Sequence, residues 1–293
     1  MERQKYRVII PFLLPALLLY VVFVVYPALR SMYVSLHVWR GLSANMRFVG
    51  LFNFQTMLSD QIFWKALSHN LLYLLTLPVT ILAIALFFAF LFTQGIRGAG
   101  FFRITFFFPQ VISLVAVGVL WSFIYHPTIG ILNALLKLVG LGGFTRAWLG
   151  DVNLVLPAVG TVVVWHAVGF YMVLLIAAMQ TVPGEFYEAA RLDGASAWQL
   201  FRHVTFPLLW DTVQVAFVFL AIGALDMFAI TQTMLIEGGP SRAGEVLATY
   251  LFRVAFVQSG FGYATAIAVT LFGIKLVISV ATLIATRRER LEY

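Results

Sequence analysis

Long runs of apolar residues dominate the chain, and shorter segments between them hold most of its charged and turn-forming residues. A helix needs roughly 20 apolar residues to cross the hydrocarbon core of a bilayer. The pattern therefore predicts an all-α, polytopic membrane protein with six transmembrane helices in one domain, residues 1–293. The six predicted spans are about 8–36, 69–93, 104–125, 154–180, 208–235 and 261–285.

Two of these runs contain features that refine the prediction. The first follows three basic residues, Arg3, Lys5 and Arg7, as a signal peptide would, but it is too long for one, and we expect a retained span. The third contains Pro109 and Gly118, and a kink is expected there because proline leaves a helical carbonyl without its donor.

Composition supports lipid as the solvent of this chain. Hydrophobic residues make up 62% of it and charged residues only 11%, whereas soluble domains are about a quarter charged. The net charge is +7, but no basic stripe with interleaved aromatics is present, so no nucleic-acid partner is expected. The absence of cysteine excludes disulfides and thiolate metal sites.

Basic residues predict the orientation. They concentrate in the two termini and in the links 94–103 and 181–206, while the longer opposite loops hold fewer. Cytoplasmic flanks carry such an excess, so both termini are expected in the cytoplasm. The residues concerned are Arg3, Lys5, Arg7, Arg97, Arg103, Arg191, Arg202, Arg287, Arg288 and Arg290.

The residue pattern of 181–206, called here the 181–206 loop, predicts two short helices joined by a turn. Pro183 suits a first helical position, and the helix is expected to stop at Asp193-Gly194 because glycine adopts the left-handed exit conformation. Ser196 with Gln199 forms a capping-box pattern for the second helix, which should end before Pro207.

Small alanines stand beside large aromatic residues in this loop. Such a surface suits a partner, since small residues let another backbone approach and aromatic residues anchor an interface. An amphipathic loop lying on the membrane surface is the alternative, and the residue pattern alone leaves both open. The residues are Phe186, Tyr187, Ala189, Ala190, Ala195, Trp198 and Phe201.

The loop also resembles a known family. Glu188-Ala189-Ala190, Asp193-Gly194-Ala195, Phe201 and Pro207 match the EAA loop of ABC-importer permeases, most closely the carbohydrate branch of the maltose and glycerol-phosphate type. The resemblance covers nearly the whole chain. Three further segments share it: Phe48-Val49-Gly50-Leu51 with Asn53-Phe54, Gly238-Gly239-Pro240, and Phe261-Gly262-Tyr263-Ala264.

This resemblance implies a coupling role for the loop. The expected coupling residues are Glu188, Ala189, Ala190, Asp193, Gly194, Ala195 and Phe201. Glu188 would contact a basic group of a cytoplasmic ATPase dimer, Gly194 would form the turn, and Asp193 would cap or brace it. The other implied partners are a second, related permease, an extracytoplasmic solute-binding protein, a sugar and membrane lipid, in a bacterial or archaeal cytoplasmic membrane. ATP and Mg are expected on the ATPase, and no cofactor is expected in this chain.

Three ionisable residues lie near the centres of their predicted spans: His166, Asp226 and Lys275. Intramembrane charges are costly and mark cavities or partners. A sugar-binding lining is predicted from Trp165, His166, Phe170, Tyr171, Asp226, Phe228, Thr231 and Gln232. Two other interpretations stay open: Asp226 and Lys275 neutralise each other, or His166 is a neutral core residue bonded to a carbonyl.

Motif absences narrow the function. The sequence has no Gly-Lys-Ser/Thr phosphate loop, no His-Glu-x-x-His metal pattern and no Gly-x-Ser-x-Gly elbow. The chain is therefore not expected to be an enzyme or to hold a metal. The main prediction is a sugar or oligosaccharide permease subunit of an ABC importer. The alternatives are an importer of a polyol phosphate and an ion-coupled secondary transporter, which would show inverted repeats and broken helices; the sequence indicates neither.

Overall fold

The computed structural model describes residues 2–41 and 45–285, without side chains for 2–10 and 285. It forms two compact units: Met1–Trp64 with Tyr250–Ile274, and Lys65–Thr249 with Lys275–Tyr293. The three boundaries between these units all fall inside helices: α4 (Gln61–Thr93), α14 (Leu247–Phe252) and α15 (Phe261–Ala285). The single domain expected over 1–293 therefore stays a prediction.

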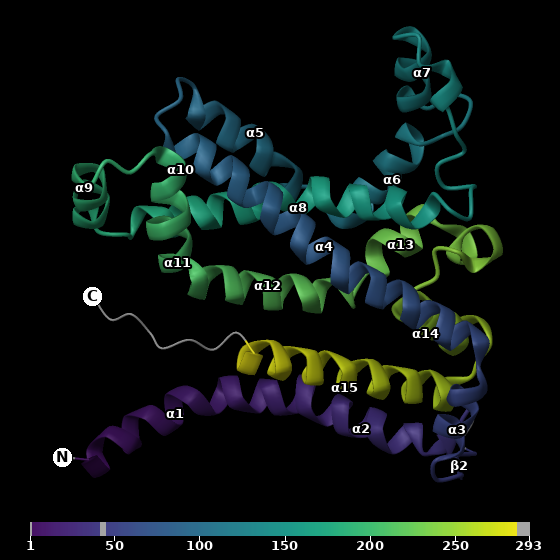
Figure 1. The fold of residues 1–293 in the computed structure, drawn as a ribbon. Helices are drawn as coiled ribbons and strands as arrows, with labels where there is room; N and C mark the ends of the chain where they lie inside the picture. Colours follow the sequence, from purple (N-terminus) through teal and green to yellow (C-terminus); the bar gives the residue numbers. More distant parts are fainter. Residues whose placement is uncertain (1, 42–44, 286–293) are drawn as a thin grey trace. The chain divides into compact units, whose positions relative to one another are not determined.

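The first unit begins with one long helical run and ends on the first part of α15 (Figure 1). A π-helical turn, Val21–Val25, joins the first two helices without a break in the run. The elements that lie wholly or partly in this unit are α1 (Glu2–Tyr20), α2 (Tyr26–Ser35), β1 (His37–Val38), β2 (Arg47–Phe48), α3 (Phe52–Ser59), α4 (Gln61–Thr93), α14 (Leu247–Phe252) and α15 (Phe261–Ala285).

Two residues of the family-like segments hold the end of α2 in this unit. The buried Asn53 amide donates to the carbonyls of Ser35 at 2.7 Å and His37 at 2.9 Å. Gly262 opens α15 so close to β1 that an added Cβ would lie 2.0 Å from the His37 carbonyl oxygen. β1 pairs antiparallel with β2, a minimal ribbon in an otherwise helical chain.

The second predicted span begins earlier than expected. α4 starts at Gln61, two turns before the predicted 69, because Asp60 caps it. Asp60 Oδ1 accepts from the amides of Ile62 at 2.8 Å and Phe63 at 3.3 Å, which satisfies first-turn donors that have no partner inside the helix.

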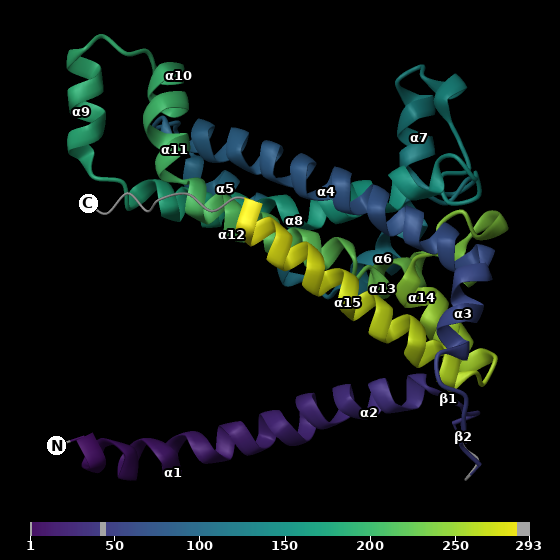
Figure 2. The same ribbon diagram turned by 60° about the horizontal axis from the view of Figure 1, so that its bottom comes forward.

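The second unit contains the remaining helices. Figures 1 and 2 show a helical hairpin, α9 with α10, that projects past the ends of α4 and α8. The elements not yet named are α5 (Ala99–Val111), α6 (Leu114–Ile124), α7 (Ile131–Leu138), α8 (Val155–Gln180), α9 (Gly184–Leu192), α10 (Ala197–Leu200), α11 (Phe206–Leu208), α12 (Trp210–Ala224) and α13 (Phe228–Met234).

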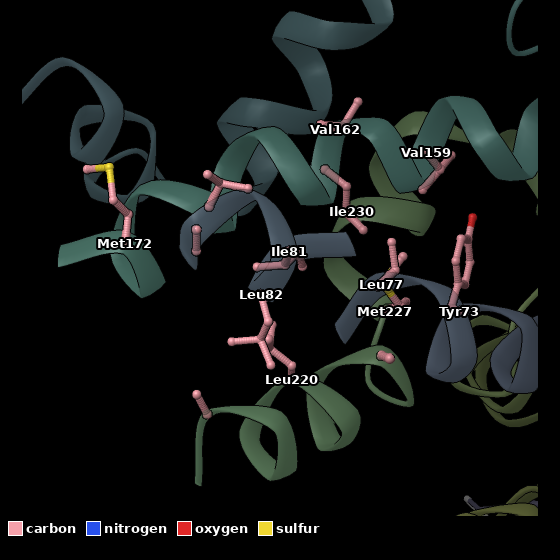
Figure 3. Packing of buried hydrophobic residues seen from close by; sticks show 14 of the residues in the cluster. Tyr73, Leu77, Ile81, Leu82, Val159, Val162, Met172, Leu220, Met227 and Ile230 are labelled. Carbon is pink, nitrogen blue, oxygen red and sulfur yellow. The ribbon is translucent and has the colours of Figure 1, made fainter. Parts of the chain in front are cut away.

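The core of this unit lies among α4, α8, α12 and α13. Figure 3 shows Ile81 and Leu82 of α4 between Val162 of α8 and Leu220 of α12. A hydrogen bond also links two helices of this core: buried Tyr73 donates to the Leu156 carbonyl at 3.0 Å. Satisfied polar groups let these helices pack closely away from water.

The third predicted span, 104–125, is broken rather than kinked. α5 and α6 meet at an angle of 100°, and the residues between them, Ile112 and Ser113, are extended. α5 instead packs on α8, at Gly169, where an added Cβ would lie 1.8 Å from the Phe106 carbonyl oxygen. A break, followed by the short helix α6, therefore takes the place of the expected kink.

The fifth predicted span, 208–235, is also divided. α12 ends at Ala224, and α13 starts at Phe228 after an irregular turn. Before it, the helical run Ala197–Leu208 meets α12 at 69°. The second helix of the 181–206 loop thus continues through Pro207, contrary to prediction, because a π-helical turn, Phe201–Thr205, precedes it and shifts the backbone pairing.

The helices agree with a membrane protein. Among the described residues, four helices are long and apolar enough to cross a membrane, Pro11–Ser35, Gln61–Thr93, Val155–Gln180 and Phe261–Ile284, and counting each bent pair as one span gives up to six. The fourth and sixth spans coincide with α8 and α15 to within a residue. The two bent pairs correct one expectation, because the sequence indicated no broken helices and the structure contains them. Intact helices are therefore not an argument against a secondary transporter.

Candidate functional site

The first helix of the 181–206 loop ends in a Schellman motif. The Ala195 amide donates to the Ala190 carbonyl at 3.0 Å, and the Gly194 amide donates to the Arg191 carbonyl, also at 3.0 Å. Gly194 has φ +79°, a conformation that glycine adopts without the steric cost that a Cβ imposes. The spacing of Ala190, Gly194 and Ala195 is therefore the spacing that this helix end requires.

The second helix of the loop begins with a complete capping box. The Ser196 amide donates to Gln199 Oε1 at 2.8 Å, and the Gln199 amide donates to Ser196 Oγ at 3.4 Å. Tyr187 of α9 lies 3.2 Å from Thr205 Oγ1 through its hydroxyl. The two helices are thus held as one hairpin by their own side chains and backbone.

Aromatic residues attach the hairpin to α4. The Phe201 ring is half-buried and lies 5.0 Å from the ring of Phe90 and 5.5 Å, stacked, from Trp198. Aromatic ring pairs of this kind contribute stabilisation beyond that of the surface area that they bury. Phe201 is therefore a base for the hairpin rather than part of its exposed tip.

The predicted coupling residues other than Phe201 lie on the exposed part of this hairpin. Glu188, Ala189, Asp193 and Gly194 are exposed, and Ala190 and Ala195 are half-buried. In the described chain, neither the Glu188 nor the Asp193 carboxylate makes a hydrogen bond or ion pair. Asp193 ends α9 through its backbone amide, and its side chain forms no brace with any described residue.

The predicted substrate residues of α8 face different surroundings. His166 is 8% exposed, and its Nε2 lies 3.3 Å from the Ile112 carbonyl oxygen, at the break between α5 and α6. Trp165 and Phe170 are 39% and 40% exposed, and Tyr171 is half-buried beside Phe170. The geometry of His166 is that of the carbonyl-bonded core histidine described above as an alternative.

The remaining predicted substrate residues lie at and after the α12 end. Asp226 occupies the irregular turn, and its Oδ2 lies 3.4 Å from Lys275 Nζ on α15. Gln232 is exposed and Phe228 half-buried, but Thr231 is only 1% exposed. The eight residues therefore do not lie on one exposed surface of this chain.

Sequence reasoning missed a buried polar junction in the second unit. Asn70 is fully buried; its Nδ2 donates to the Ala224 carbonyl at 3.2 Å, and its Oδ1 accepts from the Leu247 amide at 2.8 Å. One side chain thus satisfies a carbonyl at the end of α12 and an amide at the start of α14. A polar residue inside an apolar run was the available signal, but its partners lie 154 and 177 residues away in the chain.

Several of the basic residues that predict the orientation lie outside the described part of the chain. Arg287, Arg288 and Arg290 lie beyond the described residues, and the side chains of Arg3, Lys5 and Arg7 lie outside them too. No group of three or more His, Cys, Asp or Glu residues in the described part of the chain could hold a metal ion.

Most of this chain matches one known protein family. The model of the family "Binding-protein-dependent transport system inner membrane component" matches residues 64–290. The diacetylchitobiose uptake system permease of Streptomyces coelicolor is 41% identical over 281 residues, 92% of this chain and 80% of that protein. The alpha-glucoside transport system permease of Rhizobium meliloti is 36% identical over 272 residues, 89% of this chain and 76% of that protein.

A solved structure shares the fold. The crystal structure of a bacterial ABC transporter involved in the import of the acidic polysaccharide alginate matches with a TM-score of 0.86 and 20% identity, over 98% of each chain. With its six-span helical pattern, its exposed helical hairpin and a family match over most of its length, this chain belongs to the binding-protein-dependent transport system inner membrane components, the permease subunits of ABC importers.

Proposed function

We propose that this permease imports a sugar or oligosaccharide and that its 181–206 loop couples import to an ATPase on a separate chain. The observation that carries the coupling role is the exposed α9–Gly194 hairpin, which presents the Glu188 carboxylate without a partner among the described residues. An exposed carboxylate of this kind suits an arginine of another chain.

The closed helix end gives the hairpin its mechanical role. Because the Schellman motif, the capping box and the Tyr187–Thr205 contact fix α9 to the helical run before α12, a push on α9 is transmitted to the spans rather than absorbed by a flexible turn. In this proposal ATP and Mg act on the ATPase dimer, and closure of that dimer moves the hairpin.

The sugar assignment rests on relatives and on charge. The relatives named above transport diacetylchitobiose and alpha-glucosides. The lysine of the sixth span is already paired with Asp226, whereas a phosphate-bearing substrate would favour unpaired cations in the cavity. Both features favour a neutral sugar over a polyol phosphate.

The remaining parts of the proposal follow from the coupling role. The hairpin faces the cytoplasm, both termini lie on that side, and the membrane is a bacterial or archaeal cytoplasmic membrane. A second, related permease completes the pathway, and an extracytoplasmic solute-binding protein delivers the sugar. Trp165, Phe170, Tyr171, Asp226, Phe228 and Gln232 remain the proposed sugar contacts, with His166 and Thr231 supporting them from the core.

Crosslinking tests the docking surface directly. The chain has no cysteine, so one cysteine in place of Leu192, which is 89% exposed beside the motif, provides a unique probe. It should crosslink to an ATPase subunit in native membranes, whereas Ile236→Cys, equally exposed between α13 and Gly238, should not. Crosslinking from neither position, or equally from both, would contradict the docking assignment.

Substrate identity needs the assembled importer. In proteoliposomes with its binding protein, a neutral oligosaccharide should stimulate ATP hydrolysis, and glycerol phosphate should not. Stimulation by polyol phosphates alone would replace the sugar assignment while leaving the coupling role intact.

A further inference from the structure

A cavity of about 530 Å³ lies in the second unit between the ends of α4 and α8 and the 181–206 loop. Its volume is within the range of small-ligand sites, roughly 300–1,000 Å³. The polar side chains that line it come from four separate segments: Thr93, Gln94, Arg103, Gln180, Tyr187, Arg191 and Thr205.

The charge of this cavity has one sign. Arg103 and Arg191 both line it, and its described lining includes no aspartate or glutamate. Two guanidinium groups without a carboxylate between them repel each other, and an anion placed between them relieves that repulsion. The cavity is therefore suited to a negatively charged ligand.

Arg103 is held in place with donors to spare. Its Nη2 donates to the Phe92 carbonyl at 3.1 Å, which fixes the guanidinium against the end of α4. Within the described chain, its buried Nε has no hydrogen-bond partner. A planar, partly fixed guanidinium with free donors matches the oxygens of a phosphate group.

The positive N-terminal end of α5 also favours an anion in this cavity. α5 begins at Ala99, which lines the cavity, and its N-cap is Gly98 at φ +82°. This helix has no side-chain cap and no acidic residue in its first turn. Its positive end is thus free to act on an anion in the cavity.

Arg191 brings the 181–206 loop into the site. It lies in the last turn of α9, is exposed, and makes no ion pair within the described residues. An anion held by Arg191 and Arg103 together would join α9 to the start of α5.

We propose that this cavity binds a phosphate group, with Arg103 and Arg191 as its principal ligands, and that the bound phosphate fastens α9 to the α4–α5 junction. The ligand is a phosphate mono- or diester, carried either by a soluble organophosphate or by an anionic lipid headgroup. This site is separate from the proposed sugar contacts and goes beyond the coupling role of the exposed α9 face.

Binding to the purified, delipidated full chain in maltoside detergent tests the proposal. In one arm, glycerol phosphate is titrated at constant ionic strength and the melting temperature is followed. In the other arm, phosphatidylglycerol is added and its retention is measured by native mass spectrometry. A phosphate-dependent rise in melting temperature identifies a soluble ligand, and lipid retention alone identifies a headgroup; either outcome supports the site.

Substitutions test whether Arg103 and Arg191 hold the bound phosphate group. Arg191→Gln should weaken whichever ligand binds by at least about tenfold, the effect of one lost charge-assisted hydrogen bond, and Arg191→Lys should weaken it less. Arg202→Gln, an exposed arginine of the same loop outside the cavity lining, should leave binding unchanged.

Arg103→Gln should abolish binding, but Arg103 also holds the Phe92 carbonyl, so a loss of folding would make that variant unusable. Arg191→Gln then decides, because its side chain is exposed. Absence of both phosphate and lipid binding in the unaltered chain, or equal losses in Arg191→Gln and Arg202→Gln, would overturn the proposal.

Discussion

Lys275 Nζ lies 3.4 Å from Asp226 Oδ2, so the two opposite charges of the fifth and sixth predicted spans face each other. The Lys275 side chain is 22% exposed and that of Asp226 is 61% exposed. Each therefore neutralises the other, and the exposed carboxylate engages Lys275 through only one of its two oxygens, Oδ2. The ion pair with Lys275 and the role of a sugar contact are therefore compatible for Asp226. A carboxylate in such a pair can still accept a hydrogen bond from a sugar hydroxyl.

A double-mutant cycle separates these roles. Asp226→Asn should lower stability by up to about 1 kcal/mol because it leaves Lys275 without a counter-charge, and Lys275→Met in that background should restore it. Thermal unfolding in detergent measures the stability. Strictly additive effects would show that the pair contributes nothing. A raised KM for sugar that persists in the rescued double variant would identify Asp226 as a sugar contact.

Gly194 tests the coupling hairpin through backbone strain. A Cβ at this position would meet no atom within 4 Å, so the cost of Gly194→Ala is conformational, roughly 1 kcal/mol. The expected result is ATP hydrolysis that no longer drives full uptake, with normal membrane insertion. Gly184→Ala is the control, because that glycine also has open space and no positive φ. Normal transport by Gly194→Trp would contradict the docking role.

The capping box predicts a local effect on the loop. Ser196→Ala should destabilise α10 by about 1 kcal/mol, because it removes the side-chain acceptor of the Gln199 amide. Hydrogen exchange of the 197–200 amides should therefore accelerate, while the α8 amides stay protected. Gln199→Ala removes the reciprocal bond, so combining both variants should cost less than the sum. Unchanged exchange in Ser196→Ala would show that tertiary contacts alone hold the helix.

Gly169 predicts the importance of the close α5–α8 contact. Gly169→Ala places a methyl group against the Phe106 carbonyl and should cost about 1–3 kcal/mol through overpacking. Gly273→Ala, a glycine of α15 with nothing within 4 Å, is the matched control and should be close to neutral. Melting temperatures of the two purified variants provide the comparison, and equal values would argue against the contact.

Asp60 predicts a pH dependence outside the spans. Burial favours a raised pKa for this carboxyl, but hydrogen bonds from Tyr250, Tyr263 and two backbone amides outweigh it and lower the pKa. The folded chain therefore binds this proton less readily than the unfolded chain, so the stabilisation is present above the unfolded pKa, about pH 4, and is lost as the pH falls through the lower folded pKa.

The measurement is the difference in melting temperature between the unaltered chain and Asp60→Asn. It should stay constant from pH 7 to about pH 5 and shrink below about pH 4. Asp211→Asn, at an exposed position on α12, serves as the comparison. A difference that grows as the pH falls would have the wrong sign for this carboxylate.

Local features of the chain were accessible from the sequence. Apolar length predicted the membrane spans, because a bilayer core imposes a minimum helix length. Ser196 with Gln199 predicted a capping box, and Gly194 predicted a left-handed turn, because both depend on residues within one or two turns. The resemblance of residues 188–195 predicted the family that comparison then confirmed.

Helix breaks were not accessible in the same way. The third span bends by 100° because α5 can pack against Gly169 of α8 and because His166 reaches the carbonyl that the break exposes at Ile112. The continuation through Pro207 depends on a π-helical turn that no local rule required. The break between α5 and α6 thus depends on partners distant in the chain.

The sequence by itself determined that this is a helical membrane protein with a structured loop at residues 181–206, because bilayer thickness and helix-end chemistry act over short stretches. The tertiary structure decided how the charges are used. It paired Lys275 with Asp226, bound His166 to Ile112 and placed Arg103 and Arg191 around one cavity. Electrostatic and hydrogen-bond energies depend on distance in space, and that distance is fixed only when the helices pack.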